Sequence, residues 1–269
     1  MTPLLAVGAI AVAALGAHLW MAQGFWRKGA ALVATLSKAS PVSRGHAPSP
    51  LIDAALRNGA DRDGGWRTLR IVQDAQFRMG PDKPWVPMPA VQHISLGAPG
   101  FVWIARQPGL IVPRFAVIDA FVAGQGHLYA ALFGSVPVAS MAGPVTDRAE
   151  AMRYLAELAW APDAIAGNPA LVWRKISDVE VEVSLAVAAD RVAVRLHLDG
   201  HGNILEMQAD RPDTAPDGTT FTRPWRGSFT DYGQIGGRTI PRAGEVGYVY
   251  PDGYHAYWRG RILDYDLMT

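Results

Sequence analysis

Three residues are the candidates for a general acid or base: Glu157, Asp231 and His255. Glu157 lies between two aromatic residues, Tyr154 and Trp160, in a segment with a helical pattern. A carboxyl group beside apolar side chains has a raised pKa, which suits proton transfer near neutral pH. Arg153, four residues earlier, would lower that pKa by pairing with Glu157. We therefore interpret Glu157 as a charge on the less buried face of a helix, and Asp231 as a partner of arginines on adjacent strands.

Metal, nucleotide and nucleophile motifs are missing from the sequence. His197 and Asp199 share one face of a strand, but the DGHGN stretch around Asp199 is typical of a turn and brings no third well-placed ligand. The chain has no cysteine, which excludes disulfides and thiolate ligands. It has no G-x-S-x-G motif, no phosphate-binding loop and no dinucleotide fingerprint. We predict neither a metal site nor a cofactor.

The nine tryptophans are the more unusual feature of the chain. Five fall in segments that we expect to frame a sheet: Trp103, Trp160, Trp173, Trp225 and Trp258. Arg226, Tyr257 and Arg259 alternate with them in the stretches RPWRGSF and AYWRGRI. Such side chains can stack on a ligand, and either arginine can neutralise an acidic head group. The plainer interpretation is an amphipathic sheet surface with solvated arginines. A net charge of +1 gives no reason to expect nucleic acid as a partner.

Strands must position most of these residues. Period-two apolar patterns recur from Leu69 onward and are clearest in VEVEVSLAV, residues 179–187. Asp252-Gly253 predicts a tight hairpin turn, which places Trp258 opposite Gly247. With 49% hydrophobic and 18% charged residues, the chain can bury a large core. We predict a mainly β (α+β) fold: a large curved antiparallel sheet or open half-barrel, with about ten strands, packed on one main helix.

The main helix is predicted to begin near Thr146 and to stop before Pro162. Asp147 and Glu150 can form a capping box at its start. An apolar stripe at helical spacing should pack on the sheet: Met152, Leu155, Ala156 and Ala159. Glu150, Arg153 and Glu157 fall on the opposite side. Trp160 should help to close a pocket between helix and sheet.

The N-terminal segment predicts a membrane anchor. Residues 4–23 carry no Asp, Glu, Lys or Arg and have the length of a bilayer span, with Arg27 and Lys28 following. A cleaved signal peptide is the alternative, although a basic start is lacking. The flanking charges favour a single-pass inner-membrane protein with its domain in the cytoplasm, and the side stays open. We expect an anchor over 1–26, a tether over 27–65 that can include a short helix, and one β-rich domain over 66–269.

The order of motifs VWIAR…DAFVAGQGHLYAALFGSVPVA…RYLAELAWAP…PWRGSFTDYGQIGGRTIPRAGEV…YWRGRI resembles an uncharacterised bacterial domain-of-unknown-function family. The resemblance covers most of the chain from about Trp66, and the Trp-Arg-Gly blocks are its most specific parts. It implies a membrane-anchored protein and supplies no catalytic residue. The expected topology is also similar to lipoprotein-carrier-like half-barrels, which implies a lipid held between sheet and helix. That second likeness is one of architecture alone.

Three functions are compatible with this sequence. The first is a membrane-anchored binding domain for a lipid or another hydrophobic molecule, with the five tryptophans, Arg226, Tyr257 and Arg259 around the ligand. The second is an enzyme that applies acid–base chemistry to an apolar, membrane-derived substrate through Glu157, Asp231 or His255. The third is a scaffold module of a membrane complex, in which an exposed aromatic patch replaces a closed pocket. An empty cavity beneath the helix would favour the first two.

Overall fold

A computed structural model describes residues 3–214, 217 and 219–269, with residues 3–11, 213 and 214 described by their backbone only. The helical elements are α1 (Pro3–Leu36), α2 (Ser49–Arg57), α3 (Pro144–Ala156), a 3-10 turn η1 (Glu157–Trp160) and α4 (Pro162–Gly167). The first seven strands are β1 (Thr68–Phe77), β2 (Val86–Pro87), β3 (Ala90–Ser95), β4 (Phe101–Gln107), β5 (Phe115–Val122), β6 (Gln125–Leu132) and β7 (Val136–Ala142). The others are β8 (Val172–Lys175), β9 (Glu180–Val187), β10 (Asp190–Leu198), β11 (Ile204–Thr214), β12 (Thr220–Ile235), β13 (Arg238–Tyr250) and β14 (Gly253–Met268).

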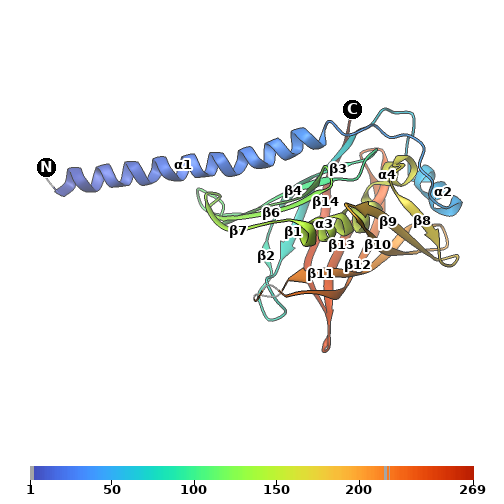
Figure 1. Ribbon diagram of the computed structural model, residues 1–269. Coiled ribbons are helices and arrows are strands. Elements are labelled where there is room, and N and C mark those ends of the chain that lie inside the picture. Colours follow the sequence, from blue (N-terminus) through green and yellow to red (C-terminus); the bar gives the residue numbers. More distant parts are fainter. Residues whose placement is uncertain (1–2, 215–216, 218) are drawn as a thin grey trace.

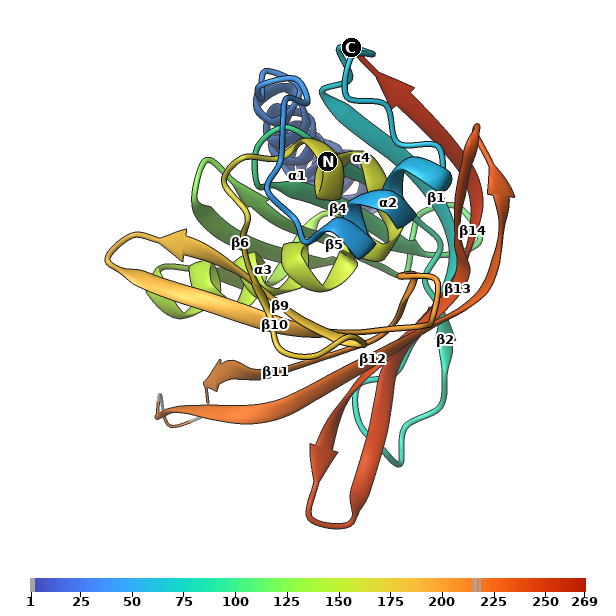
Figure 2. The same ribbon diagram turned by 90° about the vertical axis from the view of Figure 1, so that its right-hand side faces the viewer.

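The strands form one 14-stranded antiparallel sheet in the order β7-β6-β5-β4-β3-β1-β14-β13-β12-β11-β10-β9-β8, with β2 beside β1. The sheet has two halves, which we call wings: one runs from β7 to β1 in this order and the other from β14 to β8. The pairing of β1 with β14 joins the two wings in the middle of the sheet. The sheet curves strongly, so that the wings approach each other around α3 (Figures 1 and 2). The predicted mainly β fold with a large curved antiparallel half-barrel is confirmed.

Helix α3 lies inside the curve of the sheet. It contacts β5, β6 and β7 of one wing and β9, β10 and β11 of the other (Figure 2). The predicted capping box at its start is wrong, because Pro144 occupies the first turn after Gly143 and no side chain caps the helix. Asp147 instead accepts a hydrogen bond from the Gly126 backbone N–H at 2.7 Å, which ties α3 to the β5–β6 hairpin.

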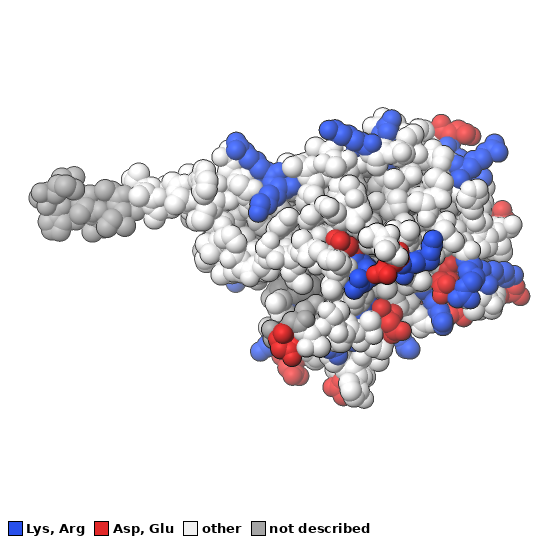
Figure 3. All heavy atoms as spheres, in the orientation of Figure 1, with Lys and Arg blue, Asp and Glu red and all other residues white. Residues whose placement is uncertain are grey.

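The second half of α1 covers the convex face of the same sheet. Phe25, Leu32 and Leu36 pack there against strand residues that include Val102 and Ile118. Strands β4 and β5 are therefore buried on both faces, which accounts for their nearly continuous apolar sequences. The first half of α1 projects beyond the domain, and its described part shows no Asp, Glu, Lys or Arg side chain (Figures 1 and 3).

The predicted transmembrane segment does not receive support from the structure. In the part of the chain whose side chains are described, no helix is both long and apolar enough to cross a bilayer. The side chains of residues 4–11 of the predicted span lie outside that part. The helix itself continues to Leu36, beyond the predicted anchor boundary at residue 26.

The residues predicted as a tether contain α2 and pack on the domain. Leu51, Ala54 and Ala55 of α2 are buried, and α2 contacts α4 at the end of the half-barrel opposite the β13–β14 turn. That end is held by a buried ion pair: Arg238 donates from Nε and Nη2 to the two carboxylate oxygens of Asp163 at 2.8 and 2.9 Å. Asp163 also accepts the Asp61 backbone N–H at 2.9 Å.

We predict that Asp163→Asn lowers the free energy of unfolding by about 3–5 kcal/mol, because it leaves Arg238 buried without a counter-charge. Urea denaturation followed by circular dichroism measures this change. Arg174→Ala is the matched control, since the Arg174 side chain is 62% exposed and its pair with Glu182 should contribute less than about 1 kcal/mol. A loss for Asp163→Asn no larger than that of the control would contradict a structural role for the buried pair.

Candidate functional site

A cavity of about 1140 Å³ lies between α3 and the concave face of the sheet. Most of its lining is apolar or aromatic, contributed by β1, β4–β7, β11–β14, α3 and η1. Exposed side chains such as Met79 and Phe133 belong to the same lining, so the cavity opens to solvent at the end where the β1–β2 and β6–β7 connections lie. The helix therefore covers an empty apolar space rather than filling it.

A polar row crosses the concave face of one wing. The strand register sets Gln92 of β3 opposite Trp103 of β4, and Trp103 opposite Asp119 of β5. Cross-strand neighbours on one face lie within contact distance of each other. Gln73 of β1 joins the row by accepting a hydrogen bond from Trp103 Nε1 at 2.8 Å and donating to Gln92 at 3.0 Å.

Helix α3 and η1 place three charged residues against this row. Glu150, Arg153 and Glu157 follow at spacings of three and four, so they share one face. Arg153 donates to Glu157 Oε1 at 2.9 Å and to Asp119 Oδ2 at 2.5 Å. Gln92 Nε2 donates to the second Glu157 oxygen at 2.5 Å. The expected position of Glu157 on a less buried helix face is thus wrong: its side chain is only 14% exposed, because both sides of α3 are covered by the sheet.

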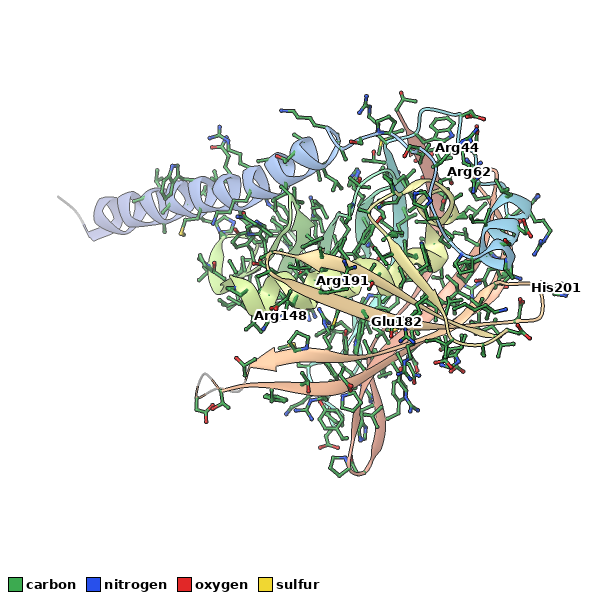
Figure 4. The ribbon with its side chains drawn as sticks, turned by 45° about the vertical axis from the view of Figure 1, so that its right-hand side comes forward. Arg44, Arg62, Arg148, Glu182, Arg191 and His201 are labelled. Carbon is green, nitrogen blue, oxygen red and sulfur yellow. The ribbon has the colours of Figure 1, made fainter. Side chains whose placement is uncertain are left out.

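A second set of polar contacts extends from Glu150 to the other wing. Arg211 of β11 donates from Nη2 to Glu150 Oε1 at 2.9 Å and from Nη1 to the Tyr257 hydroxyl at 3.3 Å. Trp225 Nε1 donates to the same hydroxyl at 3.0 Å. The negative charge of Asp119 acts on Glu150, so the two sets are linked electrostatically. In contrast, Arg148 lies at the start of α3 beside the β9–β10 turn, where it pairs with Asp190 at 3.3 Å (Figure 4).

We call Asp119 and Glu150 the carboxyl pair. Burial, together with the neighbouring Asp119 carboxylate, raises the pKa of Glu150 from 4.5 to about 8, although Arg211 and Arg153 oppose this shift. Burial alone would lower the pKa of Arg153, but Glu157, Asp119 and Glu150 outweigh it and raise that pKa. At neutral pH the Glu150 carboxyl group is therefore protonated. The guanidinium of Arg153 stays charged.

An aromatic wall faces the carboxyl pair, formed by Trp160, Trp225, Phe229, Tyr257 and Trp258. The Trp160 ring packs edge-on against Phe229 and Trp258, with centroids 5.4 and 5.9 Å apart, and its Nε1 donates to the Pro241 carbonyl at 3.0 Å. A Cβ at Gly244 would come within 3.0 Å of the Trp160 ring, so this strand glycine makes room for the indole. Trp160 lines the cavity from η1.

The predicted register of the β13–β14 hairpin is wrong. The turn lies one residue earlier, at Pro251-Asp252, and Trp258 stands opposite Val246 rather than Gly247. A β-bulge inserts Tyr257 as an extra residue between the partners of Val246 and Gly247. Both Tyr257 and Trp258 consequently line the cavity, which strict alternation along a strand would not allow.

Seven of the predicted site residues line the cavity: Trp103, Glu157, Trp160, Trp225, His255, Tyr257 and Trp258. His255 lies towards the open end, with Nε2 3.0 Å from an Asp252 carboxylate oxygen and its ring against Tyr250. Trp173 is half-buried in the core on the edge strand β8, whereas the cavity lining of that wing ends at β11. Trp173 therefore does not reach the site.

The other three predicted residues lie outside the cavity. Arg226 and Arg259 are exposed because they follow the inward-facing Trp225 and Trp258, and neighbouring strand residues point to opposite faces. Arg259 donates to the Gln76 side chain at 2.7 and 2.9 Å. Asp231 accepts hydrogen bonds from Arg242 and Arg261 at 2.7 and 2.6 Å, which confirms the expected pairing. The hydrogen bond from Arg242, followed by that from Arg261, lowers the pKa of Asp231 and keeps its carboxyl group ionised.

Sequence reasoning missed Asp119 and Arg211 and assigned Glu150 to a cap. Asp119 was detectable as the one acidic residue in the otherwise apolar strand FAVIDAFV. An ionisable residue in such a strand needs a buried partner. Nothing in the sequence pairs Arg211 with Glu150, because the two residues belong to distant elements that only the curvature of the sheet brings together.

Fold and site together define a half-barrel domain whose curved sheet and inner helix enclose an apolar cavity with a polar network in its wall. The chain belongs to the family of unknown function DUF6544, which matches residues 48–260. The expected resemblance to a domain-of-unknown-function family is thereby confirmed. No curated protein matches the chain.

Three solved structures have a similar fold. A domain described as an outer membrane lipoprotein-sorting protein from Vibrio parahaemolyticus is 11% identical with a TM-score of 0.46, covering 81% of this chain and 92% of its own. A LolA superfamily protein from Nitrosomonas europaea is 10% identical with a TM-score of 0.43, covering 82% and 93%. A DUF1329 family protein from Desulfovibrio piger is 8% identical with a TM-score of 0.45, covering 82% and 94%. The likeness is one of general fold.

The raised pKa of Glu150 predicts an unusual pH dependence of stability. Between about pH 4.5 and about pH 8 the folded state keeps a proton that the unfolded state has lost. The free energy of unfolding should therefore fall as pH rises through this range and level off above it. Urea denaturation at a series of pH values measures this dependence. In Glu150→Gln the free energy of unfolding should no longer fall between about pH 4.5 and about pH 8, whereas Glu206→Gln, which changes an exposed residue, should behave as the parent does. Equal slopes in the two variants would show that Glu150 does not carry the proton.

Proposed function

We propose that this protein binds a lipid-like hydrophobic molecule in the cavity between α3 and the curved sheet. The observation that carries the proposal is a cavity of about 1140 Å³ with apolar and aromatic walls, open at one end. Pockets for drug-sized ligands measure about 300–1,000 Å³ and are lined mainly by apolar side chains with a few placed polar groups. A single long-chain amphipathic molecule matches this volume and this lining.

The rim of the cavity supports the same proposal. Exposed apolar side chains surround the open end: Met79, Leu110, Ile111 and Phe133. Their connections, β1–β2, β4–β5 and β6–β7, all lie at one end of the antiparallel sheet. Such side chains are unfavourable in water and favourable beside a hydrocarbon chain or a lipid surface. A hydrophobic ligand entering here meets these apolar side chains first and the mainly apolar lining of the cavity next.

An acid–base enzyme is the second candidate, favoured by one observation. The carboxyl pair and Glu157 are buried carboxyl groups in the cavity wall, which is the arrangement that the enzyme hypothesis requires. We place binding first because arginines form ion pairs with all three carboxyl groups.

A scaffold role is less well supported. It requires an exposed aromatic patch, whereas four of the five predicted tryptophans line the cavity.

We predict that protein purified from cells carries a hydrophobic molecule detectable by mass spectrometry, and that the delipidated protein binds the uncharged fluorescent probe N-phenylnaphthylamine. Ala130→Phe places a ring in the cavity and should weaken probe binding by at least about tenfold, or about 1.4 kcal/mol. Ala186→Phe, on an exposed strand position, is the control and should bind as the parent does. If no molecule co-purifies and the probe does not bind, the proposal fails.

We further propose that the projecting part of α1 attaches the protein to a lipid surface. Its described residues include the exposed apolar side chains of Val12, Leu15, Leu19 and Trp20, and no Asp, Glu, Lys or Arg occurs before Arg27. The His18 ring lies 2.7 Å from the Ser135 hydroxyl in the β6–β7 turn, so this part of α1 lies beside the open end of the cavity. Apolar helix residues partition into membranes, and aromatic residues followed by basic ones suit the interface.

Full-length protein should float with phosphatidylcholine vesicles in a density gradient. A double variant, Leu15→Glu with Leu19→Glu, should lose most of that attachment, because each charge opposes insertion into hydrocarbon. Val172→Glu with Val179→Glu introduces the same two charges at exposed apolar positions outside α1 and should float normally. Equal flotation of both variants would rule out α1 as the attachment site.

A further inference from the structure

The carboxyl pair has two buried oxygens without a hydrogen-bond donor. Arg153 donates a hydrogen bond to Asp119 Oδ2 at 2.5 Å, and Arg211 donates one to Glu150 Oε1 at 2.9 Å. The other two atoms, Asp119 Oδ1 and Glu150 Oε2, receive no hydrogen bond from the residues that the structure describes. Asp119 is 7% and Glu150 4% exposed, and both line the cavity. Buried carboxylate oxygens without a donor are strongly unfavourable, so this position needs a donor.

When Glu150 is ionised, the charges around the pair are short of one positive group. The ionisable side chains that meet in this part of the wall are three carboxyl groups, Asp119, Glu150 and Glu157, and two guanidinium groups, Arg153 and Arg211. Arg153 stacks over Trp103 and Arg211 over Trp225, so both cations are already engaged. With every carboxyl ionised, the cluster keeps one uncompensated negative charge between apolar walls.

We propose that the ammonium group of an amphipathic amine supplies the missing charge, binding between Asp119 Oδ1 and Glu150 Oε2 with its hydrocarbon chain in the rest of the cavity. This inference rests on the proposed binding function and names the class of ligand. An ammonium group offers three N–H donors and forms charge-assisted hydrogen bonds with carboxylates. A carboxylate or phosphate head group would instead bring a further negative charge beside two carboxyl groups. Arg226 and Arg259, which could have neutralised an acidic head group, lie outside the cavity. Two further arginines in its lining, Arg78 and Arg114, belong to the β1–β2 and β4–β5 connections at its open end.

In the absence of an amine, a proton occupies the same place. The titratable groups that face the pair are Arg153 and Glu157 beside Glu150, Arg211 on β11, Tyr248 on β13 and Tyr257 on β14. Burial raises the pKa of Tyr257, which keeps its hydroxyl neutral. Because the pKa of Glu150 is about 8, an amine that binds at neutral pH must displace its proton. Alkylammonium groups resemble Lys and stay protonated up to about pH 10. Amine affinity should therefore rise with pH up to about 8 and then level off.

The test compares three ligands with the same hydrocarbon chain: dodecylamine, dodecanol and dodecanoate, each kept in monomeric form. Each displaces N-phenylnaphthylamine from the delipidated full-length protein at neutral pH. We expect dodecylamine to bind about ten- to a hundredfold more tightly than dodecanoate, as charge-assisted hydrogen bonds imply. Calorimetry in buffers with different ionisation enthalpies should show the release of up to one proton for dodecylamine and none for dodecanol.

Glu150→Gln keeps the shape of the side chain and removes its charge. It should lower the affinity for dodecylamine at least about tenfold and abolish its pH dependence, while the affinity for dodecanol stays within about twofold. Glu206→Gln should change neither affinity. If Glu150→Gln does not fold, judged by circular dichroism, Asp119→Asn provides the same comparison from the other side of the pair.

The outcomes separate the two proposals. If neither the probe nor any of the three ligands binds, the proposed function itself fails. If the probe binds but dodecanoate competes as well as dodecylamine, the ligand is not an amine and the binding function stands. If dodecylamine binds most tightly but Glu150→Gln leaves its affinity and pH dependence unchanged, the carboxyl pair is not its site.

Discussion

The site depends on one guanidinium group, that of Arg153. It joins the Asp119 carboxylate of the sheet to the carboxylate of Glu157, four residues further along the chain, and it stacks over the rings of Phe101 and Trp103. A helix can turn its charged face towards the inside of a half-barrel only if every charge finds a partner there. Because these partners come from different elements, the ion pairs set both the depth and the rotation of α3. The cavity is the space that this position of the helix leaves open.

Small residues in the helix and the sheet keep that space from being filled. Ala156 of α3 and Ala130 and Ala139 on the facing strands line the cavity with single methyl groups. The large rings are concentrated on the opposite wall, where Gly244 accommodates Trp160 and Gly260 lies against Trp258. A tightly packed interior would distribute large and small residues so that no such volume remained. The separation of small and large residues, rather than any single side chain, makes the cavity.

The sequence predicted those features that depend on local periodicity. Alternating apolar residues located the strands, and the interrupted helical pattern before Pro162 located α3 with η1. Trp103, Trp160, Trp225 and Trp258 were correctly placed on the cavity, because buried strand and helix faces can be read from spacing. Arg226 and Arg259 were misassigned, since residues adjacent to inward tryptophans on a strand point outward. The β-bulge at Tyr257 and the Arg211–Glu150 pair could not be predicted, because both arise from contacts between strands or elements far apart in the sequence.

The pairing of β1 with β14 has a consequence for the folding of the chain. The two strands are neighbours in the middle of the sheet, where Thr68 pairs with Met268. In the sequence, however, almost the whole domain separates these two residues. During synthesis, β3–β7 and β8–β13 can each form from local hairpins, but both wings keep an unpaired inner edge until β14 has left the ribosome. Such long-range contacts slow folding, and unpaired edges invite aggregation. Premature termination before Gly253 would thus leave two half-sheets with exposed edges, and cells have reason to protect the nascent chain until its final hairpin closes the middle of the sheet.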